Sequence, residues 1–143
     1  MLLKLRAYAK INLSLKVLGK RADGYHEIES LMQSVSLSDY LTLEPVSSGI
    51  AIFTNDPSLA VDHRNLAFRA AELFFHRQKN CPIKGIKIYL QKCIPVAAGL
   101  AGGSADAAAV IWGLNQMMEE KERLSEEKLL ALGAQIGSDV PFC

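Results

Sequence analysis

The 143-residue sequence has little of several features that mark particular classes of protein. Its three cysteines are an odd number without metal-ligand spacing, which favours free thiols in a reducing cytoplasm over a disulfide framework or a zinc site. The formal net charge is only +1, so no electrostatic argument favours nucleic acid or an acidic membrane as a partner. No apolar run is long enough to span a bilayer, and the N-terminus lacks the apolar core of a signal peptide. We therefore expect a small cytoplasmic domain of ordinary globular composition.

A glycine-rich segment is the most informative feature that is present. Gly99, Gly102 and Gly103 fall within five residues and run directly into an alanine-rich stretch with helical spacing. No lysine follows the glycines as in a P-loop, and the spacing is not that of the dinucleotide fingerprint. A glycine loop that opens a helix offers backbone N–H groups to an anion and lets it approach closely. The pattern is compatible with a phosphate loop, and close packing of small residues explains it about equally well.

Periodicity along the chain predicts a β-rich start followed by a β-α-β arrangement. Alternating apolar residues predict strands over 3–17 (a strand pair or one long bent strand), 35–43, 50–54 and 84–90. Helical spacing predicts helices over 65–79, over a buried stretch after the glycine loop, and from an N-cap at Ser125 to an end between Gly133 and Gly137. The alternation places Lys10 and Asn12 on a polar strand face, opposite core-facing Ile11 and Leu13. Finally, Asp139 and Val140 resemble the entry to a further strand.

Four segments together resemble a known family. They are Ala9–Asn12 (AKIN), Arg21–His26 (RADGYH), the glycine loop Pro95–Ser104, and Gly137–Pro141 (GSDVP). Their order and spacing resemble the GHMP kinase superfamily and, within it, the kinases that phosphorylate 4-diphosphocytidyl-2-C-methyl-D-erythritol in the non-mevalonate isoprenoid pathway. The resemblance covers the whole chain. It implies an α+β fold with a mixed β-sheet, helices packed on one face, a β-α-β phosphate-loop unit and a likeness to a ribosomal protein domain.

The resemblance implies ATP and Mg²⁺ as cofactors. The residues that would bind ATP are Pro95, Val96, Ala97, Ala98, Gly99, Leu100, Ala101, Gly102, Gly103, Ser104 and Ala105, with Asn65 and Lys92 at the adenine end. Helix capping by Asn65 and a solvated charge at Lys92 are equally good explanations of those two residues. Many superfamily members carry two serines where this chain has Gly102 and Gly103, so no Mg²⁺ ligand is carried over.

The same resemblance assigns a catalytic pair. Asp139 would accept the proton of the substrate hydroxyl as that oxygen attacks the γ-phosphorus. Lys10 would keep Asp139 ionised and stabilise the developing charge, and Asn12 would bind substrate or orient Lys10. The simpler alternatives are a turn aspartate and an ordinary exposed strand lysine.

Tyr25 and His26 would recognise the cytidine end of the substrate by the same resemblance. An aromatic ring can stack on the base, and an imidazole can hydrogen-bond the pyrimidine edge. The alternative is a buried tyrosine and a satisfied histidine after a tight turn. His63 and His76 are predicted to lie at the surface.

Members of this family are about twice as long as this chain. We therefore expect residues 1–143 to be the N-terminal ATP-binding domain, poorly active or inactive alone, with a possible homodimer through exposed apolar surface. A second interpretation is another GHMP kinase of the homoserine or mevalonate type, against which RADGYH argues. A third is a non-catalytic binding module with a ribosomal-protein-like fold, which the near-neutral charge weakens.

Overall fold

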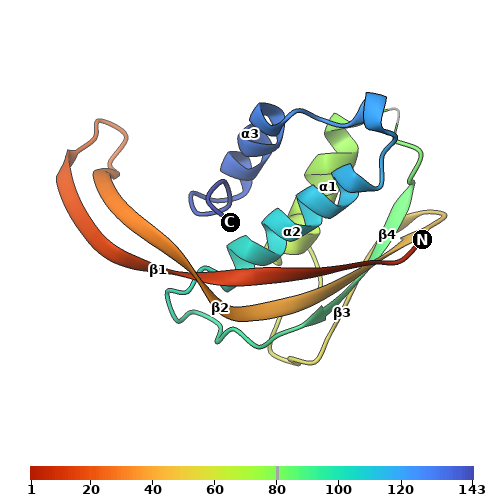
Figure 1. Cartoon of the computed structure of the whole chain (residues 1–143), viewed down its shortest axis with the longest axis horizontal. Helices are drawn as coiled ribbons and strands as arrows, with labels where there is room; N and C mark the ends of the chain where they lie inside the picture. Colours follow the sequence, from red (N-terminus) through yellow and green to blue (C-terminus); the bar gives the residue numbers. More distant parts are fainter. Residues whose placement is uncertain (80) are drawn as a thin grey trace.

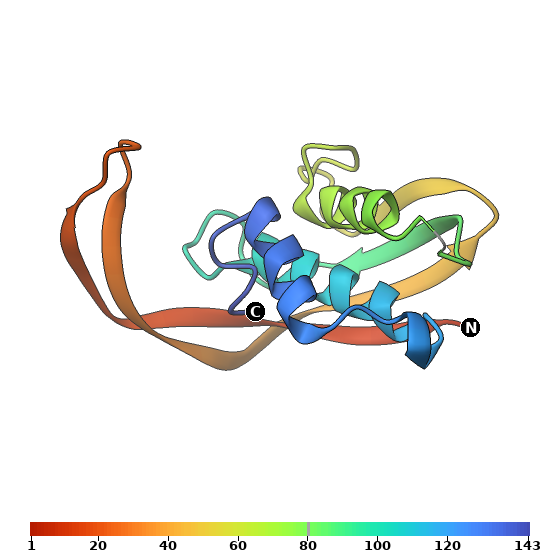
Figure 2. The same ribbon diagram turned by 90° about the horizontal axis from the view of Figure 1, so that it is seen from above.

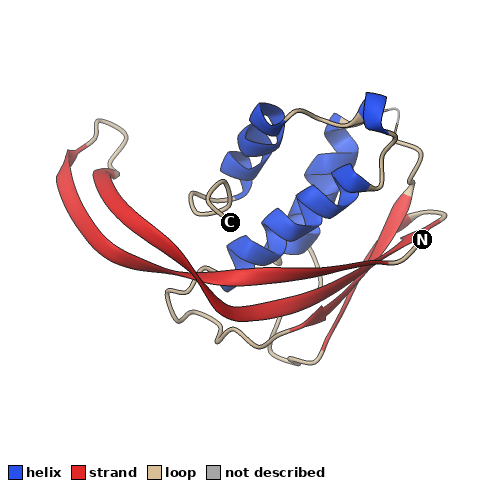
Figure 3. Cartoon of the chain, viewed as in Figure 1, coloured by secondary structure: helices blue, strands red, loops and turns tan. Residues whose placement is uncertain are grey.

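The computed structural model describes residues 1–79 and 81–143, and it consists of a four-stranded sheet with helices on one face (Figure 1; Figure 3). The strands are β1 (Leu3–Lys20), β2 (His26–Val46), β3 (Gly49–Thr54) and β4 (Gly85–Gln91). The helices are α1 (Leu66–Arg77), α2 (Gly102–Gln116) and α3 (Glu126–Ile136), with a 3₁₀ turn over Glu120–Glu122. The predicted α+β class, mixed sheet and one-sided helix layer are confirmed.

The strand order in the sheet is β1-β2-β4-β3. β1 pairs with β2 and β2 pairs with β4 in antiparallel fashion, whereas β3 and β4 are parallel. Because parallel neighbours need a crossover, the chain passes from β3 through α1 to β4, which gives the predicted β-α-β unit. The glycine loop then joins the end of β4 to the start of α2. The core between sheet and helices is formed by buried apolar side chains, the largest being Phe74, Leu41, Leu43, Ile86, Ile88, Leu90, Leu114 and Val110.

The strands β1 and β2 are much longer than β3 and β4. Their distal parts and the turn between them, residues 11–37, form a curved hairpin that extends past the helices and bends towards the helix-bearing side (Figure 1; Figure 2). We call this hairpin the arm and the remainder of the chain the body. Every residue of the arm is exposed or half-buried, including the apolar Leu13, Leu15 and Leu31. The arm therefore contributes no side chain to the core.

The predicted elements differ from the structure mainly at their ends. β1 is the single long bent strand of the two alternatives, and β2 begins at His26 rather than at residue 35. Ser125 is the N-cap of α3, although its side chain makes no capping hydrogen bond. The expected strand at Asp139 and Val140 is wrong. Those residues lie in consecutive turns, in which Val140 N–H donates to the Gly137 carbonyl and Cys143 N–H to the Asp139 carbonyl.

Two expectations drawn from composition can be compared with the described residues. Cys81, Cys93 and Cys143 are free thiols, and Cys81 is buried. His63 and His76 are exposed, as predicted. Among the described residues, no helix combines the length and the apolar character that crossing a membrane requires.

Candidate active site

The glycine loop has left-handed backbone at three positions. Gly99 has φ of +75°, and Ala97 and Ala101 both have φ of +57°. Left-handed backbone is unfavourable for alanine and persists where the surrounding structure imposes it, often at ligand sites. The sequence pattern drew attention to the glycines, but two of the three left-handed residues are alanines. We conclude that the loop holds a specific strained shape, which close packing of small residues does not require.

The loop ends at the N-terminus of α2. Ala101 is the N-cap residue and Gly102 begins the helix, so the first backbone N–H groups of α2 have no partner within the helix. A cavity of about 270 Å³ is formed by the whole loop together with Leu59, Arg64, Asn65, Leu66, Lys92 and Asp106. The helix dipole adds partial positive charge at this end. The cavity thus combines the features that bind phosphate, and it contains the predicted residues from Pro95 to Ser104.

Lys10 and Asp139 lie together although they are far apart in the sequence. The Lys10 Nζ is 3.3 Å from Asp139 Oδ2, and it donates to Asn12 Oδ1 at 3.3 Å. The backbone N–H of Lys10 donates to the carbonyl of Leu100 at 3.1 Å. The Asp139 side chain is 37% exposed, whereas that of Lys10 is 6% exposed. The pair is therefore tied directly to the glycine loop, with its carboxylate accessible from solvent.

The predicted faces of this part of β1 are wrong. Lys10 is buried, whereas Ile11 is 37% and Leu13 is 58% exposed. The pairing of β1 with β2 is irregular between Tyr8 and Lys10, which interrupts the simple alternation of faces. Beyond that point the strand enters the arm, so Ile11 and Leu13 have no core to face. The alternative of an ordinary exposed strand lysine is also wrong.

Tyr25 and His26 lie at the tip of the arm, and the structure does not bring them next to Lys10 or Asp139. Tyr25 is 74% exposed and His26 is exposed, so the alternative of a buried tyrosine is wrong. The turn is built locally: Gly24 has φ of +88°, as its Asp-Gly sequence predicts, and the Arg21 N–H donates to the Tyr25 carbonyl at 2.6 Å. The aromatic ring is thus presented to solvent on an ordered turn.

Asn65 caps the helix that borders the cavity. Its Oδ1 accepts from Ala67 N–H at 2.9 Å, and its amide nitrogen donates to the Ala60 carbonyl at 2.8 Å. The capping interpretation is therefore confirmed. Asn65 also contributes to the cavity wall, beside the loop, so a contact with a ligand is compatible with its place.

Lys92 is not the solvated charge that the simpler alternative supposed. Its side chain is 6% exposed, and its ammonium lies 2.5 Å from Asp39 Oδ2 and 2.9 Å from Asp106 Oδ2. Burial acts to lower the pKa of Lys92, but the two carboxylates outweigh it and raise that pKa. Lys92 is therefore a fixed cation in the wall of the cavity.

Asp39 and Asp106 were missed by sequence reasoning. Asp39 is fully buried, and its Oδ1 accepts from the backbone N–H groups of Cys93 and Ile94 at 2.6 and 2.8 Å. Burial raises the pKa of Asp106 to about 7, and the nearby Lys92 ammonium opposes that rise. One signal was available: Asp106 is the only charged residue of an otherwise apolar or uncharged helix. Asp39, by contrast, looks like any polar strand residue.

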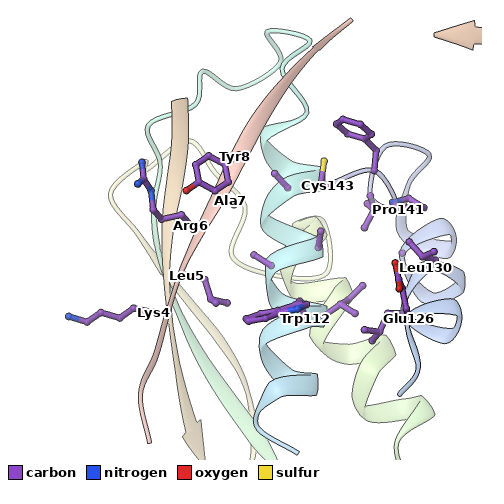
Figure 4. A pocket seen from close by; sticks show the side chains of 18 residues that line it. Lys4, Leu5, Arg6, Ala7, Tyr8, Trp112, Glu126, Leu130, Pro141 and Cys143 are labelled. Carbon is purple, nitrogen blue, oxygen red and sulfur yellow. The ribbon is translucent and has the colours of Figure 1, made fainter. Parts of the chain in front are cut away.

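A larger cavity of about 700 Å³ lies between β1, α2, α3 and the C-terminal turn (Figure 4). Its wall is mainly apolar and includes Trp112, Leu130 and Pro141. Burial raises the pKa of the Cys143 thiol at its edge to about 11, so this thiol is a poor nucleophile. Of the predicted site residues only Ala105 borders this cavity. We therefore assign phosphate binding to the smaller cavity, despite its size.

Comparisons with known proteins agree with this geometry. The family model of the GHMP kinases N terminal domain matches residues 65–143. A 4-diphosphocytidyl-2-C-methyl-D-erythritol kinase of Clostridium acetobutylicum is 47% identical over 141 residues, which cover 99% of this chain and 49% of that protein. The enzyme of the same name from Caldicellulosiruptor bescii is 48% identical over 142 residues, covering 99% and 48%.

Solved structures give the same picture. A crystal structure of 4-(cytidine 5'-diphospho)-2C-methyl-D-erythritol kinase superposes with a TM-score of 0.80 at 41% identity, covering 98% of this chain and 48% of that one. The Methanococcus jannaschii mevalonate kinase superposes with a TM-score of 0.67 at 15% identity, which shows a shared fold alone. The chain spans about half the length of the curated relatives it matches.

Proposed function

The chain belongs to the GHMP kinases, and from that premise we propose that it forms the ATP-binding part of a kinase. The proposed reaction transfers the γ-phosphoryl group of ATP to the 2-hydroxyl of 4-diphosphocytidyl-2-C-methyl-D-erythritol. One observation carries this proposal: Lys10 contacts both the Leu100 carbonyl and the Asp139 carboxylate, which joins an accessible candidate acid-base pair to the glycine loop. The names of the similar enzymes support the choice of substrate.

In the proposed mechanism Asp139 accepts the proton of the attacking hydroxyl. Its carboxylate is solvent-accessible and lies 3.3 Å from the Lys10 ammonium, so a hydroxyl can reach it from the open side of the pair. As the oxygen attacks the phosphorus, negative charge develops nearby, and the same ammonium stabilises it. The hydrogen bond from Lys10 N–H to the Leu100 carbonyl keeps the pair in register with the loop that carries the phosphates.

The loop from Pro95 to Ala105 would hold the ATP phosphates by its backbone N–H groups and the start of α2. Mg²⁺, when bound with ATP, would neutralise charge on the phosphate oxygens. Among the residues that the structure describes, no three His, Cys, Asp or Glu side chains gather at one point that could hold a metal.

The arm would contact the other end of the substrate. Tyr25 is exposed on an ordered turn, so its ring can stack on a cytosine without rearrangement. His26 follows it at the start of β2 and can hydrogen-bond the base. Asn12 lies where the arm leaves the body and accepts from Lys10, so it is placed to orient Lys10.

We propose that residues 1–143 form one ATP-binding domain and that this chain alone turns over slowly, because its relatives carry about as many residues again. The test is a single-turnover assay with [γ-³²P]ATP and 4-diphosphocytidyl-2-C-methyl-D-erythritol. We expect slow transfer by the chain alone. A fusion of this chain to the unmatched half of the Clostridium acetobutylicum relative should transfer faster. Homoserine and mevalonate serve as control acceptors.

Transfer of label to mevalonate or homoserine, but not to the cytidine compound, would contradict the proposed substrate and support another GHMP kinase. Failure of the chain to bind ADP in calorimetry would contradict the kinase proposal itself. Retention of RNA by the chain in a filter-binding test would favour the binding module instead.

A further inference from the structure

Three charged side chains from different elements form a buried cluster beside the glycine loop. Asp39 comes from β2, Lys92 follows β4, and Asp106 lies in the first turns of α2. The Lys92 Nζ lies 2.5 Å from Asp39 and 2.9 Å from Asp106, and all three side chains are at most 6% exposed. Two carboxylates and one ammonium are thus withdrawn from water next to the cavity that the loop encloses.

Stability does not account for Asp106. Its Oδ1 is buried without a hydrogen-bond partner among the described residues. An unpartnered buried carboxylate oxygen is costly, and the neighbouring positions 105 and 107–109 are all alanine, which favours a helix more than aspartate does. Such a group in a native structure calls for a functional explanation. Asp106 also belongs to the cavity wall, together with Lys92 and the glycine loop.

The geometry of Lys92 gives that explanation. A lysine ammonium has three N–H donors, and the hydrogen bonds of the described residues account for two of them, to Asp39 and Asp106. A Cβ at Gly102 would lie 3.2 Å from the Lys92 Nζ, so the ammonium sits directly against the first residue of α2. Its charge therefore adds to that of the helix N-terminus, and its third donor remains for a ligand in the cavity.

Asp39 fixes the backbone as well as the ammonium. Its Oδ1 accepts from the N–H groups of Cys93 and Ile94, the residues that lead from β4 into the loop. The two oxygens of one buried carboxylate thus hold Lys92 and the entry to the loop in a single arrangement. Substrate-positioning groups are effective when their own orientation is fixed in this way.

We propose that Asp39 and Asp106 are positioning residues, which hold the Lys92 ammonium beneath the start of α2 and direct its third N–H to a bound nucleotide. This inference rests on the proposed ATP-binding function. Neither carboxylate touches the reacting atoms; both act through Lys92. It follows that substitutions of Lys92 and of Asp106 should have non-additive effects on nucleotide affinity.

The test is a double-mutant cycle in ADP affinity, measured by calorimetry with Mg²⁺ on this chain. Asp106→Ala removes the acceptor and should weaken ADP binding about tenfold, the order of one lost charged hydrogen bond. Asp106→Asn keeps an acceptor oxygen and should restore at least most of the wild-type affinity. In the Lys92→Gln background, which keeps a donor for Asp39, Asp106→Ala should have little further effect.

A matched control removes a carboxylate from a surface ion pair. Glu119 lies 3.0 Å from Lys121, and both side chains are well exposed. Glu119→Gln should leave ADP affinity unchanged, which excludes a general effect of net charge. Circular dichroism melting checks the fold of each variant. If Lys92→Gln fails to fold, the contrast between Asp106→Ala and Asp106→Asn carries the test alone.

Wild-type or tighter ADP binding by Asp106→Ala would overturn the inference while leaving the kinase proposal intact. Equal losses from Asp106→Ala in the wild-type and Lys92→Gln backgrounds would also overturn it, because Asp106 would then not act through Lys92. No ADP binding by the wild-type chain would overturn the proposed function, and the inference with it.

Discussion

The arm and the body each carry residues of one proposed site, but these residues are buried in the body and exposed in the arm. In the body, the glycine loop, Lys92 and Asp39 are held by packing and by buried hydrogen bonds. In the arm, Tyr25 is carried on a hairpin whose side chains are all exposed or half-buried. Lys10, at the point where the two regions meet, is buried and bonded to the glycine loop.

This contrast suits the proposed substrate, which has two dissimilar ends. Phosphoryl transfer needs groups fixed within fractions of an ångström, and the body supplies that rigidity. Recognition of a distant base needs reach more than rigidity, and a two-stranded ribbon supplies reach with few residues. We therefore expect changes in the body to alter stability and chemistry, and changes in the arm to alter only binding of the cytidine compound.

The largest expected effect is on chemistry at the junction of the two regions. Asp139→Asn should lower the single-turnover rate of the fusion by roughly 10²–10⁴-fold, because the proposed general base is lost. ADP affinity should stay unchanged, because Asp139 pairs with Lys10 and does not line the cavity of the glycine loop. A rate within a few-fold of wild type would exclude Asp139 as the base.

The second effect concerns the buried charge of the body. The pKa of Asp106 is raised by burial from 3.8 to about 7, so its contribution to stability is fully present below pH 4 and is lost as pH rises towards 7. Asp106→Asn should remove about 2 kcal/mol of the pH dependence of the unfolding free energy between pH 5 and 7. Urea unfolding at several pH values measures this, with Glu119→Gln as the control. Parallel curves for wild type and Asp106→Asn would contradict it.

A matched pair of glycines sharpens the contrast in packing. A Cβ at Gly85 in β4 would lie 2.6 Å from the Gly49 carbonyl oxygen, whereas nothing lies within 4 Å of one at Gly19 in the arm. Gly85→Ala should therefore cost about 1–3 kcal/mol of stability, since backbone must shift. Gly19→Ala should change it by no more than about 0.5 kcal/mol. Equal melting temperatures for the two variants would contradict this contrast in packing.

The smallest effect is confined to one ligand. Tyr25→Ala should weaken binding of the cytidine compound about tenfold through loss of base stacking, and leave ADP affinity and melting temperature unchanged. The control is Tyr40→Ala, because Tyr40 is an exposed tyrosine on the sheet of the body. This variant should bind both ligands with wild-type affinity. Loss of ADP binding in Tyr25→Ala would break the division between the two regions.

Much of the body could be predicted from the sequence because local signals agree there with packing. The alternation of Ile86, Ile88 and Leu90 and the apolar spacing around Phe74 mark elements that are buried on the helix side of the sheet. The glycine loop was recognised from its composition. The left-handed conformation of its two alanines could not be predicted, because an alanine in the sequence does not indicate a φ of +57°.

The rest depended on contacts that no local pattern encodes. The prediction of which β1 residues near Lys10 face the core was wrong for two reasons. A pairing irregularity interrupts the alternation, and the arm has no core to face. Asp39 and Asp106 come together only when β2, β4 and α2 pack around Lys92, so their proposed role has no local signal. The turn at Asp139 replaced an expected strand because its backbone groups are satisfied locally.

The most direct test that the body binds ATP and the arm binds the cytidine end is amide chemical-shift mapping of the ¹⁵N-labelled chain with two ligands. ADP with Mg²⁺ should shift the amides of residues 96–105 and of Lys10, and leave those of the arm tip unchanged. CMP should shift the amides of residues 24–26 and leave the glycine loop unchanged. Shifts from ADP at the arm tip, or none in the glycine loop, would contradict the account.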